Sequence, residues 1–337
     1  MKKRVAINGF GRIGRLTFRN LINNPEIEVV AINDLTDNHT LAHLLKYDSA
    51  HGRFKGTVEY TENELIVNGT PIRALAIKNP TELPWAELEI DVVLECTGLF
   101  LDRAKAGMHL QAGAKKVLIS APAKGDDIPT IVIGVNHEQL TGEETIISNA
   151  SCTTNCLAPM VKVIEDNYTI LQGSMTTTHA YTQDQRLQDA PHSDLRRARA
   201  ASLSIIPTST GAAAALKLVI PSVKNKISAI SFRVPVITGS VTELNVFVEK
   251  ETTLEDVKAK FAAAAKAGLK GVLEYCTDPI VSCDIIDNPH SCILDVDLIQ
   301  VNGKLIKLIG WYDNEAGYSA RLADLTALVE IKEAVEV

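Results

Sequence analysis

The sequence predicts an α/β protein with two domains, a doubly wound parallel sheet followed by an α+β domain with a mostly antiparallel sheet. Three observations support this fold class. The chain has 337 residues, which is too long for one ordinary hydrophobic core. Short strand-like and helix-like segments alternate in the first half, as in parallel strands joined by helical crossovers. Longer segments of alternating apolar and polar residues follow, as in a sheet with one buried face.

The first half supplies the elements of the parallel sheet. The periodicity predicts strands at 3–8, 28–33, 91–95 and 116–120, and helices at 12–22, 40–47 and 102–112. A β-rich excursion at 52–77 interrupts this order, and Asn68-Gly69 within it is typical of a hairpin turn.

The second half supplies the longer strands. They are predicted at 168–178, 226–236, 241–250 and 304–312, and helices at 211–219, 254–267 and 315–330. A long, polar and irregular stretch lies between 180 and 202. Loops of this length are usually functional or part of an interface.

The composition excludes several classes of protein. Hydrophobic residues make up 46% and charged residues 22%, the balance of a globular protein. We expect no bilayer span, because no run of about 18 apolar residues occurs, and the basic first residues lack a signal peptide's apolar length. Six cysteines in so long a chain predict a reducing cytoplasm rather than a disulfide framework. The net charge of −7 gives no attraction to nucleic acid or membranes.

A glycine motif lies between the first predicted strand and helix. Gly9, Gly11 and Gly14 form G-x-G-x-x-G, in which the glycines permit a tight turn, approach of a pyrophosphate and close helix packing. Asp34 follows twenty residues after Gly14, at the end of the second strand. A carboxylate there accepts hydrogen bonds from the adenosine ribose of NAD and repels the 2′-phosphate of NADP. The motif therefore predicts a Rossmann-type NAD site, although Asp34 could also be an ordinary turn residue.

The segment 148–156 places a cysteine where a strand ends and a helix begins. Ser151 can cap the helix, and Cys152 then occupies the first turn. The unpaired N–H groups and positive dipole end of that turn favour a thiolate, the nucleophilic form of cysteine. Cys152 is therefore a candidate for covalent catalysis. A small buried hydrophobe, or half of a metal site or disulfide with Cys156, are the alternatives. The polar neighbours favour the nucleophile, and no metal site is predicted.

Five segments together resemble one enzyme family. They are 6–15, 148–156, 178–182, 233–235 and 310–315, and they look like the phosphorylating glyceraldehyde-3-phosphate dehydrogenases. The resemblance runs nearly end to end. It implies a homotetramer whose subunit has an NAD-binding Rossmann domain made of residues 1–150 and 316–337, the latter with a returning C-terminal helix. The resemblance also implies a catalytic domain at 151–315, between the two parts of the Rossmann domain.

The resemblance implies roles for individual residues. Cys152 resembles the nucleophile that attacks the aldehyde, and His179 the base that activates it. The matches to NAD-contacting positions are Gly9, Gly11, Arg12, Ile13, Gly14, Asp34, Lys78, Ser120 and Asn314. The matches to substrate- and phosphate-binding positions are Ser151, Thr153, Thr182, Arg197, Thr210, Gly211 and Arg233. A guanidinium is a planar fork suited to phosphate, but a half-buried salt bridge is a competing interpretation of Arg233.

The implied reaction is the NAD-dependent oxidation and phosphorylation of glyceraldehyde 3-phosphate in glycolysis. A cysteine thiohemiacetal and an acyl thioester are its intermediates, and inorganic phosphate releases the product. Two alternatives remain. The chain could be the related erythrose-4-phosphate dehydrogenase, or it could retain the scaffold mainly to bind RNA or a surface.

Overall fold

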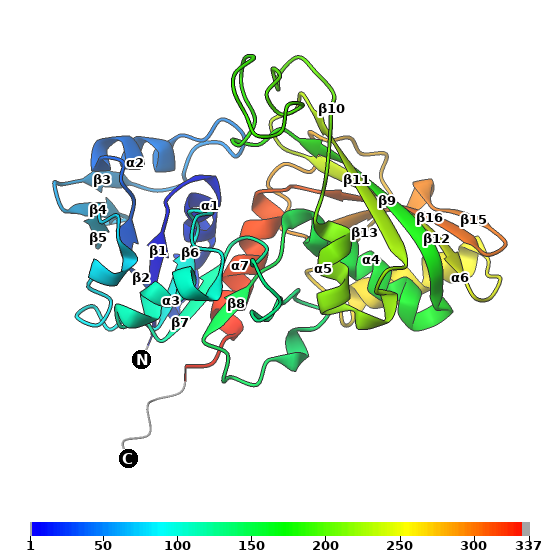
Figure 1. The fold of residues 1–337 in the computed structure, drawn as a ribbon, viewed down its shortest axis with the longest axis horizontal. Helices are drawn as coiled ribbons and strands as arrows, with labels where there is room; N and C mark the ends of the chain where they lie inside the picture. Colours follow the sequence, from blue (N-terminus) through cyan, green and yellow to red (C-terminus); the bar gives the residue numbers. More distant parts are fainter. Residues whose placement is uncertain (1, 332–337) are drawn as a thin grey trace. The chain divides into compact units, whose positions relative to one another are not determined.

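The chain forms two units, each built around an eight-stranded sheet (Figure 1). The computed structural model describes residues 2–331. The first unit comprises Met1–Ile131, His137–Ala150 and Ser319–Val337, and the second comprises Val132–Asn136 and Ser151–Tyr318. Among the described residues, no helix has the length and apolar character needed to cross a membrane.

The sheet of the first unit has the order β3-β4-β5-β2-β1-β6-β7-β8. Its strands are β1 Lys3–Asn8, β2 Ile27–Asn33, β3 Val58–Tyr60, β4 Glu64–Val67, β5 Thr70–Leu75, β6 Val92–Glu95, β7 Lys116–Ile119 and β8 Ile146–Ser148. All neighbours from β5 to β8 pair in parallel. The predicted parallel sheet is confirmed.

Three helices connect these strands, and a hairpin extends the sheet. The helices are α1 Arg12–Leu21, α2 Asn38–Lys46 and α3 Arg103–Gln111. In the hairpin, β4 and β5 pair antiparallel across Asn68 and Gly69, which have φ values of 52° and 81°. Positive φ at both positions is the geometry of a type I′ turn, as the Asn-Gly sequence predicts.

The sheet of the second unit has the order β10-β11-β9-β12-β16-β14-β13, and β15 pairs with β16. Its strands are β9 Ile170–Ala180, β10 Ile206–Thr208, β11 Ile227–Val234, β12 Ser240–Val248, β13 Leu273–Cys276, β14 Cys292–Asp295, β15 Gln300–Asn302 and β16 Leu305–Tyr312. Most pairs are antiparallel, but the sheet is mixed, because β11 pairs in parallel with β9 and β13 with β14. Parallel neighbours need a crossover connection, and α5 lies in the one between β9 and β11.

Three helices pack on one another and on this sheet (Figure 1). They are α4 Cys152–Tyr168, α5 Ala212–Val219 and α6 Leu254–Lys266. Short 3₁₀ helices lie at Pro80–Glu82, His137–Gln139, Pro221–Val223 and Val296–Leu298. The last helix, α7 Ala316–Leu328, ends in the first unit. There the Lys3 ammonium donates hydrogen bonds to the carbonyls of Thr326, Ala327 and Val329, at 2.8, 2.8 and 2.6 Å.

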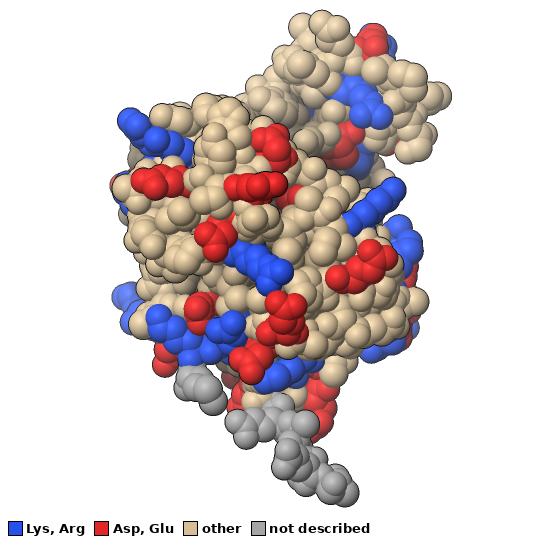
Figure 2. Space-filling model, turned by 90° about the vertical axis from the view of Figure 1, so that its left-hand side faces the viewer, with Lys and Arg blue, Asp and Glu red and all other residues tan. Residues whose placement is uncertain are grey.

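Figure 2 draws one face of the molecule, on which charged side chains of both signs lie among a larger area of other residues. On the face drawn in Figure 2, acidic and basic residues lie interspersed rather than in separate patches. Several form exposed ion pairs, such as Arg73 with Glu87 and Arg103 with Asp127 in the first unit. Such exposed pairs contribute little to stability.

Candidate active site

The first turn of α4 positions Cys152. The Ser151 hydroxyl accepts a hydrogen bond from the Thr154 amide at 3.1 Å and so caps the helix, as predicted. The next turns are anchored by side chains that the sequence predicts to be buried, and each is fully buried: Leu157, Met160, Val161 and Ile164. A buried helix with a capped start holds the cysteine in one place.

The side chain of His179 faces Cys152 from the end of β9. The Cys152 Sγ and the His179 Nε2 are 3.4 Å apart, within hydrogen-bonding distance for sulfur. The other ring nitrogen, Nδ1, lies 2.7 Å from the carbonyl oxygen of Ala180. With only 3% of His179 exposed, the ring is fixed between these two neighbours. A thiol and an imidazole in contact are the elements of an activated nucleophile.

Arg233 joins this pair because β11 runs parallel to β9. The register places Arg233 directly opposite His179. Its Nη1 lies 2.6 Å from the His179 Nδ1 and donates to the Ala180 carbonyl at 3.0 Å. No carboxylate within salt-bridge distance of Arg233 is found in the described part of the chain. A salt bridge as the sole role of Arg233 is therefore not favoured.

Burial and the guanidinium set the charges of the pair. Burial, followed by the positive charge of Arg233, lowers the pKa of His179 to about 3. Burial also raises the pKa of the Cys152 thiol, and the Arg233 charge and a hydrogen bond from Thr153 offset this only in part. The resting pair is thus a thiol beside a neutral imidazole. We expected the start of the helix to favour a thiolate; desolvation of the sulfur outweighs that effect.

Tyr312 supports the site, although the sequence assigned it no role. Its hydroxyl lies 3.1 Å from the Thr153 hydroxyl and 2.8 Å from that of Thr177. Its ring and the imidazole of His179 form a T-shaped pair, with 5.9 Å between the centroids. The sequence could have indicated that Tyr312 is buried, because it lies in the alternating strand β16, where every second side chain is buried.

A second group of predicted residues gathers around Asp184. The Arg197 guanidinium donates to the Asp184 carboxylate at 2.7 Å and to the Thr208 hydroxyl at 2.9 Å, and the Thr182 hydroxyl also donates to Asp184. The sequence did not indicate a role for Asp184, which joins Thr182 and Arg197 by hydrogen bonds. Its pKa is lowered because hydrogen bonding from Thr182 and the charges of Arg233 and Arg197 outweigh its burial.

Thr210 and Gly211 lie at the start of α5. The Thr210 hydroxyl accepts a hydrogen bond from the Ala212 amide at 3.3 Å, and Gly211 is the residue before the first turn. No hydrogen bond between described residues joins either one to the Cys152 group. Their place in a phosphate site remains a prediction.

In the first unit, the glycine turn has the shape that a dinucleotide requires. Gly9 has a φ of 91° and Gly11 has open space beside its Cα, so the backbone can approach a ligand there. A Cβ on Gly14 would lie 2.2 Å from the Gly9 carbonyl oxygen, which explains the third glycine. No side chain caps the start of α1, whose first residues are Arg12 and Ile13. These features fit NAD, whose pyrophosphate suits a helix N-terminus.

The predicted ribose ligand, Asp34, is tied to the same turn. Its carboxylate accepts from the Phe10 amide at 2.8 Å and from the Thr36 amide at 3.0 Å. Each carboxylate oxygen has more than one lone pair, so capacity for a ribose hydroxyl remains. Asp34 is thus also a turn residue; the two interpretations of the sequence are compatible.

Other predicted cofactor residues have partners of their own. The Arg12 guanidinium donates to the buried Asp48 carboxylate at 2.6 Å. Ser120 is half-buried and Lys78 is exposed. Asn314 belongs to the second unit, where its amide oxygen accepts from the Ser240 hydroxyl at 2.9 Å.

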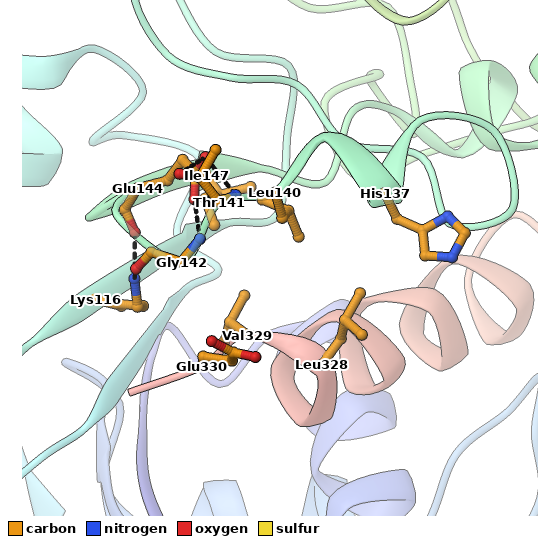
Figure 3. A pocket seen from close by; sticks show the side chains of 10 residues that line it. All are labelled: Lys116, His137, Leu140, Thr141, Gly142, Glu144, Ile147, Leu328, Val329 and Glu330. Carbon is orange, nitrogen blue, oxygen red and sulfur yellow. Dashed lines mark hydrogen bonds between the residues drawn. The ribbon is translucent and has the colours of Figure 1, made fainter. Parts of the chain in front are cut away.

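A cavity of about 190 Å³ in the first unit is separate from all of these residues (Figure 3). The loop from His137 to Glu144 and the end of α7 line it. The Lys116 ammonium beside it donates to the carbonyls of Gly142 and Glu144, at 2.7 and 2.6 Å. No residue predicted for the cofactor or substrate site lines this cavity.

A parallel-sheet unit with a dinucleotide turn, followed by a unit with a cysteine–histidine pair, is the arrangement of an NAD-dependent dehydrogenase. Residues 3–103 match the family model "Glyceraldehyde 3-phosphate dehydrogenase, NAD binding domain", and residues 151–314 match the C-terminal domain of the same enzyme. The chain belongs to the glyceraldehyde 3-phosphate dehydrogenase family, as the resemblance of its motifs predicted.

Curated relatives support this membership over the full length. The chain is 58% identical to a glyceraldehyde-3-phosphate dehydrogenase of Thermotoga maritima over 329 residues, which are 97% of this chain and 98% of the relative. It is 56% identical to that of Mycobacterium avium over 336 residues and 55% identical to that of Streptomyces coelicolor over 333. In both cases the alignment covers 98% of this chain and 99% of the relative.

Proposed function

We propose that this protein catalyses the NAD-dependent oxidation and phosphorylation of glyceraldehyde 3-phosphate to 1,3-bisphosphoglycerate. The observation that carries the proposal is the 3.4 Å contact between the Cys152 Sγ and the His179 Nε2 at the start of α4, in a chain of this family. The names of the relatives state the substrate.

The chemistry begins with the thiol. In the tautomer whose Nδ1 donates to the Ala180 carbonyl, the His179 Nε2 is free to accept the proton of the Cys152 thiol. The Arg233 Nη1 is also a donor, so in this tautomer it must turn from Nδ1 toward a bound anion. The sulfur attacks the aldehyde carbon, and the protonated His179 returns its proton to the resulting alkoxide, which gives a thiohemiacetal and a neutral ring. The hydroxyl proton of that adduct then passes to His179 as hydride leaves, and a thioester remains. Inorganic phosphate attacks the thioester, so that the acyl phosphate departs and the sulfur is released.

NAD is the cofactor of this proposal, and it would accept the hydride when bound. The residues that would hold it are the turn of Gly9, Gly11 and Gly14, the start of α1, and Asp34 at the ribose. The turn conformation and the tie between Asp34 and the Phe10 amide support this assignment.

Two guanidinium groups would hold the phosphate group of the substrate and the inorganic phosphate. Arg233 contacts His179, so a phosphate bound to it would lie beside the reacting pair. Arg197 is held by Asp184 near Thr182. Desolvated guanidinium forks bind phosphate in two-point contacts. We assign Ser151, Thr153, Thr210 and Gly211 to the same sites on the resemblance of their motifs.

An assay of NADH formation tests the proposal. Purified protein is given NAD and glyceraldehyde 3-phosphate, with and without inorganic phosphate, and erythrose 4-phosphate in a parallel arm. Multiple turnovers should require glyceraldehyde 3-phosphate and phosphate, and the Cys152→Ser variant should be inactive. Faster turnover of erythrose 4-phosphate would identify the other substrate, and phosphate-independent turnover would refute acyl transfer to phosphate.

We further propose a homotetramer in the cytoplasm. Four large apolar side chains in the irregular segment after β9 are exposed, namely Leu187, Leu195, Leu203 and Ile205, with exposed fractions of 76, 81, 83 and 67%. Apolar surface of this kind often marks a protein interface. The six cysteines are free thiols, as suits a reducing compartment. Light scattering after gel filtration measures the mass, and a monomer would contradict the assembly.

A further inference from the structure

A group of buried polar side chains lies beneath the glycine turn and takes no part in the chemistry described above. Glu95 ends β6, His109 lies in α3, and Trp85 belongs to the core that packs against Val93. Their exposed fractions are 1, 0 and 0%. Burying an ionisable carboxyl group is costly unless it is hydrogen-bonded, so this arrangement needs a reason.

The hydrogen bonds fix the tautomer of His109. The indole N–H of Trp85 can only donate, and it lies 3.1 Å from the His109 Nδ1. That nitrogen must therefore accept, and the ring proton resides on Nε2. The Nε2 lies 3.0 Å from the Glu95 carboxylate and donates to it. His109 is thus a neutral donor, oriented by Trp85.

The carboxyl group of Glu95 receives four hydrogen bonds. Besides His109, the donors are the Asn8 side-chain amide at 2.6 Å, the Thr97 amide at 2.8 Å and the Thr97 hydroxyl. The orientation of Asn8 is fixed, because its oxygen accepts from the Asn33 amide group at 2.7 Å. Each of the two Glu95 oxygens takes part in two hydrogen bonds, which is the full accepting capacity of a carboxylate. In the described part of the chain no lysine or arginine pairs with it.

The same carboxylate supports the glycine turn. The backbone at Thr97, which Glu95 holds, forms the wall behind Gly9: a Cβ on Gly9 would lie 2.7 Å from the Thr97 nitrogen. The turn is further tied to this wall, since the Cys96 amide donates to the Asn8 carbonyl at 2.7 Å. A change in the direction of the Thr97 amide would therefore be transmitted directly to Gly9.

We propose that Glu95 is a positioning residue for NAD, which uses His109, Asn8 and Thr97 to hold the wall against which the Gly9 turn is formed. The inference rests on the proposed use of NAD. It concerns how the cofactor turn is shaped rather than which groups touch the cofactor. Trp85 belongs to the same network because its indole N–H donates to the His109 Nδ1 and so leaves Nε2 as the donor.

The Glu95→Gln variant tests this role. Its amide group would present two N–H donors where the native carboxylate accepts, so two of the four native donors would lose their acceptor. We expect the dissociation constant for NADH, measured by fluorescence titration of the whole protein, to rise about tenfold. The kcat at saturating NAD and the rate of Cys152 alkylation should stay near the wild-type values. Unchanged NADH affinity in this variant would overturn the proposal.

Two further variants separate positioning from general stability. Val93→Ala removes buried volume from the same strand without changing a hydrogen bond, and it should lower the Tm with little effect on NADH affinity. In the double variant Asn8→Asp, Glu95→Gln the donor and acceptor of the Asn8–Glu95 hydrogen bond are exchanged, because the Gln amide can donate to the Asp carboxylate. This exchange should restore most of the affinity for NADH. If Val93→Ala weakens NADH as much as Glu95→Gln does, or the second change restores nothing, the role is merely structural.

A spectroscopic measurement tests the network without ligand. In protein with ¹⁵N-labelled histidine, the His109 Nδ1 should be unprotonated and Nε2 protonated at neutral pH, and Trp85→Phe should abolish this preference and weaken NADH binding. This test uses only the wild type and Trp85→Phe, so it can be carried out even if the Glu95→Gln variant does not fold. A protonated Nδ1 in the wild type would refute the network. Failure of the wild type to bind NADH, with the tautomer as expected, would instead refute the proposed cofactor.

Discussion

Replacing the buried His179 with asparagine should make the protein less sensitive to acid. His179 is neutral in the folded state, because burial and Arg233 lower its pKa to about 3. In the unfolded chain, a histidine has a pKa of about 6.5. Between these values the unfolded state binds one proton more than the folded state. Its neutral ring therefore contributes full stability above about pH 6.5, and the contribution is lost progressively as the pH falls toward 3.

The size of the effect follows from the difference between the two pKa values. Each pH unit within the window changes the free energy of unfolding by about 1.36 kcal/mol per proton. Going from about pH 7 to about pH 5 covers the upper part of the window, so His179 accounts for a loss of about 2 kcal/mol. This figure does not depend on the exact folded-state value, provided that it lies below about 4.

Denaturant unfolding at the two pH values, at one protein concentration, measures this difference. The wild type should lose about 2 kcal/mol more than His179→Asn between about pH 7 and pH 5. His39→Asn serves as the control, because His39 is exposed, and it should behave as the wild type. Equal losses in the wild type and in His179→Asn would refute the reasoning and would indicate that the folded site already holds an imidazolium beside a thiolate. The same variant should turn over about 10²- to 10⁴-fold more slowly, since it lacks the base.

Three other substitutions or modifications test the remaining assignments. One equivalent of iodoacetamide per subunit should abolish activity with the label on Cys152 by mass spectrometry, whereas labelling first at Cys156 with full loss of activity would contradict the nucleophile. Arg233→Ala should raise KM for the phosphorylated aldehyde and for phosphate by about 10- to 100-fold and affect NAD less; normal kinetics with a lower Tm would indicate a structural role only. Asp34→Gly should lower the ratio of kcat/KM for NAD over NADP by about 30-fold or more, and Asp34→Asn, which keeps an acceptor for the Phe10 amide, shows how much of that loss comes from the turn. An unchanged ratio in both would exclude Asp34 from the ribose.

Sequence patterns predicted the turns and the helix cap correctly, because these features depend only on residues that are close together in the chain. The Asn68-Gly69 turn, the glycine turn and the cap at Ser151 each depend on residues within a few positions. The parallel pairing of β9 with β11 did not follow from the alternation of residues, which is the same in parallel and antiparallel neighbours with one buried face. That pairing matters, since it places Arg233 beside His179.

The protonation states and hydrogen-bond partners at the site could not be predicted from the sequence, because they too depend on tertiary packing. The pKa of Cys152 depends on how completely the fold excludes water from the sulfur, and the contact of Tyr312 with Thr153 joins residues 159 positions apart. Asp184 likewise acquires its role only when the irregular segment folds back on Arg197. Sequence patterns identify which groups can react, while tertiary packing determines their protonation.

The hydrogen bonds from Lys3 to the carbonyls near the end of α7 have a consequence for synthesis of the chain. Lys3 leaves the ribosome 323, 324 and 326 residues before its acceptors at Thr326, Ala327 and Val329. The parallel sheet around β1 must therefore wait, with this end uncapped, while every residue of the second unit is translated. The unit that is made first is completed last, and a nascent chain that stalls before α7 carries an unfinished cofactor domain.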